Sequence, residues 1–571
     1  MLPSSYNIRI FMIFGFFLTA FTALGGWLYH IQIERHEELF SSAQKMYTET
    51  RKISGKRGEI LDAHLNRLAT TEYCKDIFIE PRRMPKTDRE RVLKQLSKIL
   101  EVPYDILKRR TESGKYEVVA KRAVSMKQNG FVEKMSLPGV ISRDSFVRKY
   151  PKHFMLANIL GFTNADLDGI AGLEQTMNVH LKAKEGFVER KRTRRGQTLF
   201  DREIDNELQS LHGNSIVLTI QEPIQFIVEK ELRRLVDEHK PKYAFAILVN
   251  PTTGAIWAMA QSPSFDPNDR SQMDPDSYRN HAIEDVYHPG STMKAISITG
   301  ALQAGIVTLQ GPEIYCENGL WFYAGRPLRD SHGYKWLSPL EIIQFSSNIG
   351  TAKMIMMGNF NKQRLYATFR RFGFGERTGI ELNHESKGLL PPVRHWDKLS
   401  ITRFPIGQGI AVTPLQMVQS YAALANNGKM MQLHLVDRVL APSGKIVKEF
   451  EPKLKRMACT KKAASDMLIA LEKVVTDGTG KRAKVKGYSV GGKTGTSQKL
   501  VNGTYEGHGK YVASFVGIAP IINPEFVLLV VADEPTGKSY YGGTVCGPTY
   551  SRISDQVLRY LDIKSTLAVN Q

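Results

Sequence analysis

Short apolar runs along the second half of the chain predict β-strands. Residues 244–250 (AFAILVN) and 255–260 (AIWAMA) are two such runs, separated by the sequence Pro-Thr-Thr-Gly. Apolar runs joined by a turn that contains proline and glycine predict a β-hairpin. Nearer the end of the chain, residues 511–519 and 525–532 (EFVLLVVA) predict a second antiparallel pair, and residues 215–220 (SIVLTI) predict a further strand.

Between these strands the pattern changes to a helical one. Residues 224–236 (IQFIVEKELRRLV) place apolar side chains three and four positions apart, which is the spacing of one helix face. Further helical segments fill the middle of the region. Strands at both ends with helices between them predict an α/β fold of the α+β kind, a sandwich closed by its own termini, rather than a repeating βαβ unit.

The N-terminal part carries one long apolar segment. Residues 10–29 (IFMIFGFFLTAFTALGGWLY) contain no charge and are long enough to span a bilayer as a helix. A basic residue before the segment and acidic residues after it predict a short cytoplasmic N-terminus (1–9), with the rest of the chain exported. A cleaved signal peptide is the alternative, because small residues occur at Ala20 and Ala23, but the run exceeds the usual ~7–15 residues.

Composition narrows the possible partners. The chain has 571 residues, of which 42% are hydrophobic and 24% charged, so it is globular with room for about two to four domains. Its net charge of +21 indicates anionic surroundings, which could be nucleic acid, lipid headgroups or an acidic polymer. The membrane segment argues against nucleic acid. The basic run at 189–195 is typical of a solvated surface, with lipid headgroups or an acidic polymer as the alternative contact.

The cysteines give no sign of a metal centre. Cys74, Cys316, Cys459 and Cys546 lie far apart and form no Cys-x-x-Cys pair. Metal sites built on cysteine need closely spaced ligands. We therefore expect buried or free thiols, no metal and no cofactor.

Ser291-Thr-Met-Lys294, at the start of an apolar helical segment, is the first indication of chemistry. Residues three apart share a helix face, and the positive end of the helix dipole favours a developing alkoxide on Ser291. Lys294 can accept the serine proton only as a neutral amine, which burial and a second nearby cation would favour. The alternative is that Ser291 only caps the helix. The pattern is weak alone, because Ser42-Ala-Gln-Lys45 matches it too.

Ser346-Ser-Asn348 is a second short motif. A hydroxyl and a carboxamide in a tight connection between helices can face one cleft, where the hydroxyl relays a proton and the amide holds a peptide group. A helix cap or loop is the alternative.

Lys493-Thr-Gly-Thr496 contains the only Lys-Thr-Gly of the chain. Its glycine-rich surroundings allow a close approach to a strand, and its lysine and hydroxyls suit a substrate that carries a carboxylate. A glycine-rich turn is the alternative. Residues 487–494 also match the phosphate-loop pattern, but no long apolar helix follows them, as such a loop requires.

The order of these three motifs resembles that of the serine penicillin-recognising enzymes, which are the penicillin-binding proteins and the serine β-lactamases. The spacings of 55 and 147 residues fit the penicillin-binding proteins. Four further segments are similar to their transpeptidase domains: 372–375 (FGFG), 378–381 (TGIE), 407–409 (GQG) and 412–416 (VTPLQ).

The preceding region narrows the resemblance to class B enzymes. Residues 57–62 (RGEILD), 148–151 (RKYP) and 169–174 (GIAGLE) resemble motifs of the class B pedestal domain. In class B enzymes the first of these motifs continues with Arg-Asn-Gly after its aspartate, but here Ala63-His-Leu65 follows. After the second motif, His153 stands where a glycine is expected. No glycosyltransferase sequence is recognised before the pedestal, which argues against class A.

Residues 160–164, 279–280 and 540–543 are similar to the division-specific, FtsI-type branch of class B. The resemblance implies the penicillin-binding transpeptidase fold with an elongated N-terminal pedestal and one transmembrane helix. The expected domains are a cytoplasmic tail (1–9), a signal-anchor (10–29), a stalk and dimerisation-type pedestal (30–213) and the transpeptidase domain (214–571). Residues 30–52, which are polar and helix-like, are expected to form the stalk.

The resemblance implies a D,D-transpeptidase that cross-links peptidoglycan through an acyl-enzyme. Ser291 is then the nucleophile and Lys294 its base. Ser346 and Lys493 relay the proton, and Lys493 also keeps Lys294 neutral, whereas Asn348 positions the substrate. The resemblance also implies that Thr494, Gly495 and Thr496 bind the substrate and its oxyanion. The backbone amides of Ser291 and Thr496 then form the oxyanion hole.

The implied partners are peptidoglycan stem peptides, β-lactam antibiotics, an FtsW-type glycosyltransferase of the SEDS family and other divisome proteins. The implied location is the bacterial cytoplasmic (inner) membrane, with the catalytic domain in the periplasm. An elongation-specific class B transpeptidase is the alternative within the family. A β-lactamase, a catalytically idle divisome scaffold and a membrane-bound β-lactam sensor are the alternatives outside it.

Overall fold

The structure is a computed structural model that describes residues 4–191, 211–271, 274–499 and 509–565. These residues fall into two compact units. The first unit comprises Met1–Lys56 with Ala183–His212, and the second comprises Arg57–Lys182 with Gly213–Gln571.

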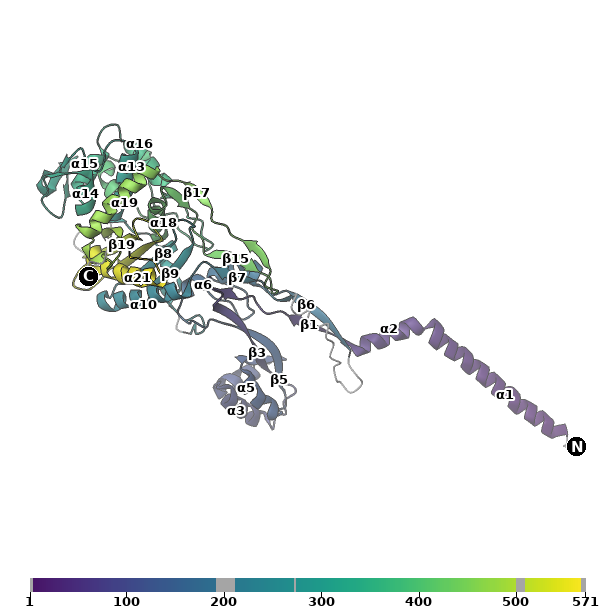
Figure 1. Ribbon diagram of the computed structural model, residues 1–571. Helices are drawn as coiled ribbons and strands as arrows, with labels where there is room; N and C mark the ends of the chain where they lie inside the picture. The colour runs from purple at the N-terminus through teal and green to yellow at the C-terminus, as the bar shows by residue number, and fades with distance from the viewer. Residues whose placement is uncertain (1–3, 192–210, 272–273, 500–508, 566–571) are drawn as a thin grey trace. The chain divides into compact units, whose positions relative to one another are not determined.

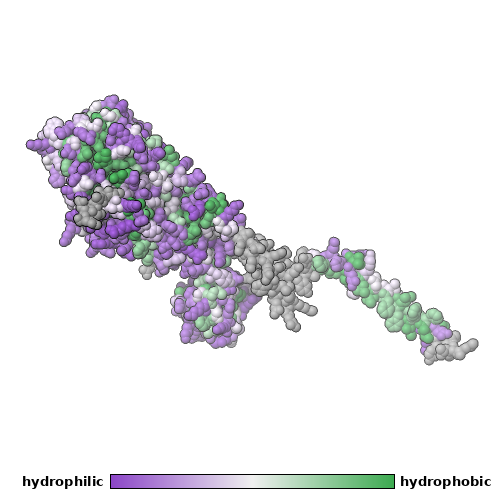
Figure 2. Space-filling view, in the orientation of Figure 1, coloured by the Kyte–Doolittle hydropathy of each residue, from purple (hydrophilic) through white to green (hydrophobic). Residues whose placement is uncertain are grey.

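A single long helix begins the first unit. α1 (Ser4–Tyr29) continues through a π-helical turn, η1 (His30–Glu34). The most apolar 18 residues of this span have no buried side chain, and Figure 2 shows the apolar character of the helix along its visible face. Among the described residues it is the one helix long and apolar enough to cross a membrane, in agreement with the prediction for residues 10–29.

The segment after this helix is only partly helical. α2 (His36–Tyr47) leads directly into the strand β1 (Thr48–Ser54), which pairs antiparallel with β6 (Glu185–Lys191). The helical prediction for residues 30–52 is therefore wrong beyond Tyr47, because the chain there joins a ladder with a partner more than a hundred residues away, which local polarity does not encode.

A five-stranded antiparallel sheet forms the centre of the second unit. Its strands lie in the order β18 (Gly491–Gln498), β19 (Tyr511–Ala519), β20 (Phe526–Asp533), β8 (Tyr243–Val249) and β9 (Ile256–Ser262). Both predicted strand pairs are present, as β8 with β9 and as β19 with β20. Because β20 also pairs with β8, strands from the two ends of this region are neighbours, which confirms the predicted α/β fold closed by its own termini.

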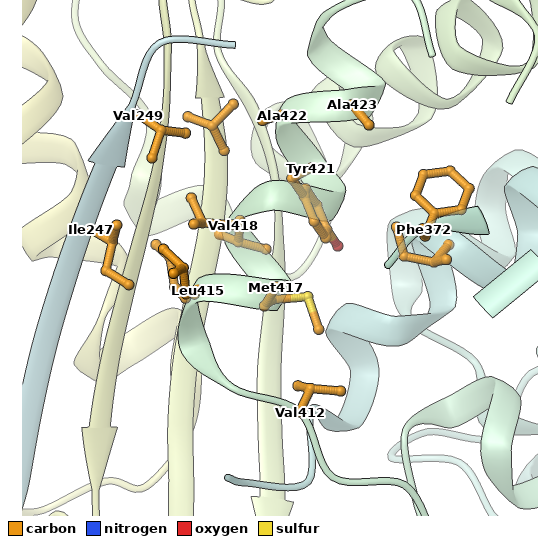
Figure 3. Packing of buried hydrophobic residues seen from close by; sticks show 14 of the residues in the cluster. Ile247, Val249, Phe372, Val412, Leu415, Met417, Val418, Tyr421, Ala422 and Ala423 are labelled. Atoms are coloured by element: carbon orange, nitrogen blue, oxygen red, sulfur yellow. The ribbon is translucent and has the colours of Figure 1, made fainter. Parts of the chain in front are cut away.

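Both faces of this sheet are buried, because successive apolar side chains of each strand point to opposite sides. On one face, Leu248 and Leu528 pack in a cluster with α10 (Glu222–His239) and α21 (Gly547–Tyr560). On the other face, Ile247 packs against α18 (Pro414–Ala425). Figure 3 shows Ile247 and Val249 opposite Leu415 and Val418 of α18, and Figure 1 shows α10 and α21 on the other side of the strands. Each such side chain contributes about 1.5–3 kcal/mol on burial.

A second sheet contains strands from the predicted pedestal and strands from the region that follows it. Its strands are β16 (Ile446–Glu449), β15 (Val436–Leu440), β7 (Ser215–Leu218), β2 (Ile60–Leu61), β3 (Arg67–Ile79) and β4 (Val118–Val124), with β5 (Val140–Lys149) also paired to β3. The predicted strand at 215–220 is present as β7, which begins where expected. It pairs in parallel with β2 of the predicted pedestal. Three helices with an apolar cluster of their own pack beside β3 and β4: α3 (Arg89–Leu100), α4 (Tyr104–Thr111) and α5 (Met126–Lys134).

The three pedestal motifs recognised in the sequence meet at Glu174, whose side chain is fully buried. Arg57 Nε and Arg148 Nε each donate a hydrogen bond of 2.6 Å to its carboxylate. The hydroxyl of Tyr150 lies 3.3 Å from the same carboxylate. A buried carboxylate between two guanidinium groups ties together segments that are far apart in the sequence, and removal of one partner leaves buried charge uncompensated.

Both departures from the pedestal motifs lie where the backbone favours glycine. Leu65 has a φ of 66° and His153 a φ of 52°. The left-handed region costs a residue with a side chain about 1–2 kcal/mol, whereas glycine enters it freely. Leu65 and His153 thus adopt turn conformations that glycine would enter without this cost.

Further elements complete the second unit. They are α6 (Ala157–Leu160), α7 (Gly172–Thr176), α8 (Asn178–Leu181), α11 (Pro275–Tyr278), α12 (His281–Glu284), β10 (Ile314–Tyr315), β11 (Leu320–Tyr323), β12 (Arg326–Arg329), β13 (Trp336–Leu337), α16 (Lys362–Arg371), α17 (Ser400–Arg403), β14 (Lys429–Met431), β17 (Leu454–Met457), α19 (Lys461–Thr476) and α20 (Gly542–Val545). The four cysteines are free thiols with buried side chains.

Candidate active site

Ser291 lies in a 3₁₀ turn, η2 (Gly290–Thr292), that runs directly into α13 (Met293–Gln303). Neither helical segment has a side-chain capping bond at its start, and the residue that flanks α13 is Thr292, which has helical backbone angles. The alternative that Ser291 only caps the helix is therefore wrong. Ser291 is partly exposed and lines a cavity of about 740 Å³.

Close backbone contacts fix the turn that carries Ser291. Gly290 donates a 3.3 Å hydrogen bond from its backbone N–H to the carbonyl of Gly407. A Cβ on Gly407, whose φ is 78°, would lie 2.3 Å from the oxygen of Gly290. The hydroxyl of Tyr421, on α18, donates to the carbonyl of Thr292 at 2.8 Å. The helix α18, whose Tyr421 is labelled in Figure 3, thus supports the turn that carries Ser291.

Lys294 follows one helical turn after Ser291, and its side chain is fully buried. Its Nζ donates to Ser346 Oγ at 3.1 Å and also to the carbonyl oxygen of Ser346. Burial lowers the pKa of Lys294 from 10.5 to about 7, against the opposing charge of Asp330, because water no longer stabilises the ammonium. A large fraction of this lysine is therefore neutral near pH 7, which is the state that a base requires.

The Ser-Ser-Asn motif forms the predicted tight connection between two helices, α14 (Pro339–Phe345) and α15 (Asn348–Ile355). Ser346 adopts a left-handed conformation, with a φ of 63°. Ser347 caps α15 by accepting a hydrogen bond from the N–H of Gly350 at 2.9 Å. The side-chain amide of Asn348 donates to the carbonyl of Arg329 at 2.7 Å. Ser346 and Asn348 both line the cavity, whereas the buried Ser347 has the structural role.

Lys493 completes the convergence of the three motifs. It lies in β18 and is fully buried. Its Nζ donates to Ser346 Oγ at 3.0 Å, so this single hydroxyl oxygen lies between the two lysine side chains. Burial lowers the pKa of Lys493 well below its usual value, and the charge of Lys294 lowers it further. The repulsion between two ammonium groups is mutual, so each lysine disfavours the charged form of the other, and burial is the largest cause that lowers the pKa of both.

Residues 494–496 occupy the strand that borders the cavity. Thr494 Oγ1 lies 2.9 Å from Thr479 Oγ1, and Thr496 Oγ1 accepts a hydrogen bond from the N–H of Gly542 at 3.0 Å. Both threonines line the cavity. Gly495 is instead closely packed, because a Cβ there would lie 2.2 Å from Ser514 Oγ and 3.2 Å from the oxygen of Pro289, which precedes the turn of Ser291. Because the segment is a strand, it does not form a phosphate loop.

Asp330 is a residue of the site that the sequence does not reveal. Its carboxylate accepts hydrogen bonds from the hydroxyl of Ser347 at 2.6 Å, from the N–H of Asn348 and from the N–H of Ile349 at 3.0 Å. It therefore fixes the start of α15 and with it the side chain of Asn348. A lone aspartate seventeen positions before its partner carries no local signal, and only the fold brings the two together.

The rim of the cavity adds aromatic and basic groups. The rings of Tyr511 and Tyr540 stack with centroids 4.0 Å apart. Lys481 and Arg482 also line the cavity, and no side chain among the described lining residues is acidic. Across the described ranges, no group of three or more His, Cys, Asp or Glu side chains is disposed to hold a metal ion. The site can thus bind an anionic ligand and activate a hydroxyl by proton transfer to an amine.

The chain belongs to the penicillin-binding protein transpeptidase family. Residues 244–555 match the model of the penicillin binding protein transpeptidase domain, and residues 52–218 match that of the penicillin-binding protein dimerisation domain. Together the two domains and the relatives below define a class B penicillin-binding protein of the FtsI type.

Two curated relatives match over nearly the whole chain. Stage V sporulation protein D of Bacillus subtilis is 31% identical over 566 residues, which cover 97% of this chain and 86% of that protein. The peptidoglycan D,D-transpeptidase FtsI of Escherichia coli is 30% identical over 569 residues, which cover 97% of this chain and 92% of that protein. Among solved structures, penicillin binding protein 3 of Mycobacterium tuberculosis, complexed with ampicillin, shares the fold with a TM-score of 0.70 at 23% identity, over 91% of this chain and 98% of that one.

Proposed function

We propose that this protein is a peptidoglycan D,D-transpeptidase that works through a serine acyl-enzyme during cell division. The observation that carries the proposal is the shared hydroxyl of Ser346, which accepts a hydrogen bond from Lys294 at 3.1 Å and from Lys493 at 3.0 Å beside the cavity lined by Ser291. Two buried amines joined through one hydroxyl form a path along which a proton can move. The name of the FtsI relative supplies the substrate class.

Acylation begins at Ser291. Its Oγ attacks the carbonyl between the two terminal D-alanines of a stem peptide, while neutral Lys294 takes the hydroxyl proton. The C–N bond breaks, and the proton passes through Ser346 and Lys493 to the leaving amine. An amine of a second stem peptide then attacks the ester, restores the Ser291 hydroxyl and completes the cross-link.

Binding groups surround this chemistry. The backbone N–H groups of Ser291 and Thr496 stabilise the oxyanion, and one such donor contributes about 3–4 kcal/mol to the transition state. The hydroxyls of Thr494 and Thr496 hold the terminal carboxylate, and the amide of Asn348 holds the peptide backbone. A β-lactam presents the same carbonyl and carboxylate, so it acylates Ser291 and stays bound.

The experiment that tests this assignment is labelling of the full-length protein, in detergent, with a fluorescent penicillin. The wild type and a Ser42→Ala variant, which alters the other Ser-x-x-Lys sequence, are expected to label equally. Ser291→Ala is expected to lose the label while its circular dichroism and melting curve stay the same. Covalent labelling of Ser291→Ala would disprove the role of this serine, and rapid release of hydrolysed nitrocefin would indicate a β-lactamase instead.

The division-specific branch and its partners form the finer part of the proposal. The segments at 160–164, 279–280 and 540–543 and the FtsI relative favour division, whereas the sporulation relative matches at similar identity. We place α1 as the single membrane anchor, with the N-terminus in the cytoplasm and the catalytic domain in the periplasm, next to an FtsW-type glycosyltransferase and other divisome proteins. A fluorescent fusion is expected at midcell. A signal along the side wall would assign the protein to elongation.

A further inference from the structure

The cavity extends beyond the groups that the donor peptide can reach. In the proposed function, which this inference extends, the donor stem ends at the carboxylate held by Thr494 and Thr496. Thr494 Oγ1 lies 2.9 Å from Thr479 Oγ1, and Lys481 and Arg482, which follow Thr479 closely in the chain, line the same cavity. The donor has no atoms beyond its terminal carboxylate. The part of the cavity lined by Lys481 and Arg482 is therefore available to the second stem peptide, which supplies the attacking amine.

Lys481 and Arg482 present two adjacent positive charges at this end. Both side chains are exposed, and neither has an acidic partner at ion-pair distance within the described parts of the chain. The described lining of the cavity contains no carboxylate either. Two neighbouring cations without counter-charges create a local field that attracts anions, and the guanidinium group matches a carboxylate with two parallel hydrogen bonds.

The turn that carries the two cations is fixed by its backbone. η6 (Lys481–Ala483) ends at Ala483, which is fully buried and donates from its N–H to the carbonyl of Gly480 at 2.8 Å. The hydroxyl of Ser551, on α21, donates to the carbonyl of Lys484 at 2.5 Å. The backbone of this turn, rather than the side chains of Lys481 and Arg482, makes the contacts that hold it in place. Substitution of the two side chains therefore leaves these contacts intact.

We infer that Lys481 and Arg482 form a subsite for a carboxylate of the acceptor stem peptide, in addition to the carboxylate that the two threonines bind. During transfer the acceptor amine attacks the ester carbonyl of acylated Ser291. The new C–N bond forms, the C–Oγ bond breaks, and the amine proton returns through Lys294 to Oγ. A second carboxylate on the acceptor, bound by the two cations, places this amine. Lys481 and Arg482 are positioning residues that select acidic acceptors.

The test compares an acceptor that has one carboxylate with a longer acceptor that has two. The full-length protein is acylated from an N-acyl-D-alanyl thioester in the presence of D-alanine, which has one carboxylate, or D-2-aminopimelate, which has two. The partition of the acyl-enzyme between transfer and hydrolysis is measured for the wild type and for a variant with Lys481→Gln and Arg482→Gln. Lys484→Gln, a neighbouring exposed cation that does not line the cavity, is the matched control.

The double variant is expected to raise the KM for D-2-aminopimelate about fivefold, because two exposed ion pairs are lost, with little change in kcat. Transfer to D-alanine and the rate of acylation stay as in the wild type, and Lys484→Gln changes nothing. An equal loss with both acceptors, or no loss with either, would overturn the inference. Absence of penicillin labelling on wild-type Ser291 would instead refute the proposed function, so the two failures are distinguishable.

Discussion

Acidification provides a direct test of Lys294 as the base. The pKa of this lysine is about 7 in the folded protein. From that value, the neutral fraction is about 0.9 at pH 8, about 0.5 at pH 7 and about 0.01 at pH 5. If acylation needs the neutral amine, its rate constant falls about 90-fold between pH 8 and pH 5.

The size of the effect comes from burial. A lysine at its ordinary pKa of 10.5 is neutral in only about 0.03% of molecules at pH 7, so the site raises the reactive fraction by about 1,600-fold. The shift of 10.5 to about 7 corresponds to about 5 kcal/mol that disfavours the ammonium in the native state. The folded pKa is depressed, so this cost is fully present below pH 7 and disappears as the pH rises towards 10.5.

The assay is the second-order rate constant for acylation by a fluorescent penicillin, measured from pH 5 to pH 9 on the full-length protein. Asp330→Asn is the informative variant, because the carboxylate of Asp330 raises the pKa of Lys294 and the amide keeps the shape of the side chain. For this variant, the fall of the acylation rate constant with acidification is expected to begin at a lower pH than in the wild type. A rate constant that changes less than twofold between pH 8 and pH 5 would show that another group takes the proton of Ser291.

Three further predictions concern the scaffold. Glu174→Gln leaves two buried guanidinium groups without their counter-charge and is expected to lower the free energy of unfolding by about 3–5 kcal/mol, measured by urea denaturation; a loss below 1 kcal/mol would contradict a buried network. Gly407→Ala places a Cβ 2.3 Å from the oxygen of Gly290 and is expected to slow penicillin acylation at least tenfold by displacing Ser291; unchanged acylation would show that the turn adapts freely. Leu65→Gly relieves a positive φ at an exposed side chain and is expected to raise stability by about 0.5–1 kcal/mol in thermal unfolding, whereas a lower melting temperature would count against strain there.

The elements that local pattern alone encodes could be predicted from the sequence. Short apolar runs locate the strands at 244–250, 255–260 and 511–519, and the turn residues between the first two identify them as a hairpin. The parallel pairing of β2 with β7 could not be predicted in this way. It joins short segments about 156 positions apart, and nothing in either segment specifies the other.

The same limit separates the site residues that the sequence reveals from those that it does not. Ser291, Lys294 and Lys493 stand in short motifs whose chemistry is recognisable. The structure brings the two lysines to Ser346 Oγ and places Ser291 on the same cavity as Ser346. Asp330 has no motif, because its function depends on three donors that the fold supplies. The lowered pKa values of the two lysines also depend on their complete burial, which the sequence does not quantify.

The neighbouring positions of β8 and β20 have a consequence for the biogenesis of this protein. The first strand of the central sheet emerges from the ribosome almost 300 residues before its partner β20, and Lys493 follows late as well. Until then β8 has an unpaired edge, and the serine has no completed proton path. An incompletely synthesised chain therefore lacks the assembled lysine pair, and its exposed strand edge makes it a natural client for holdases and proteases.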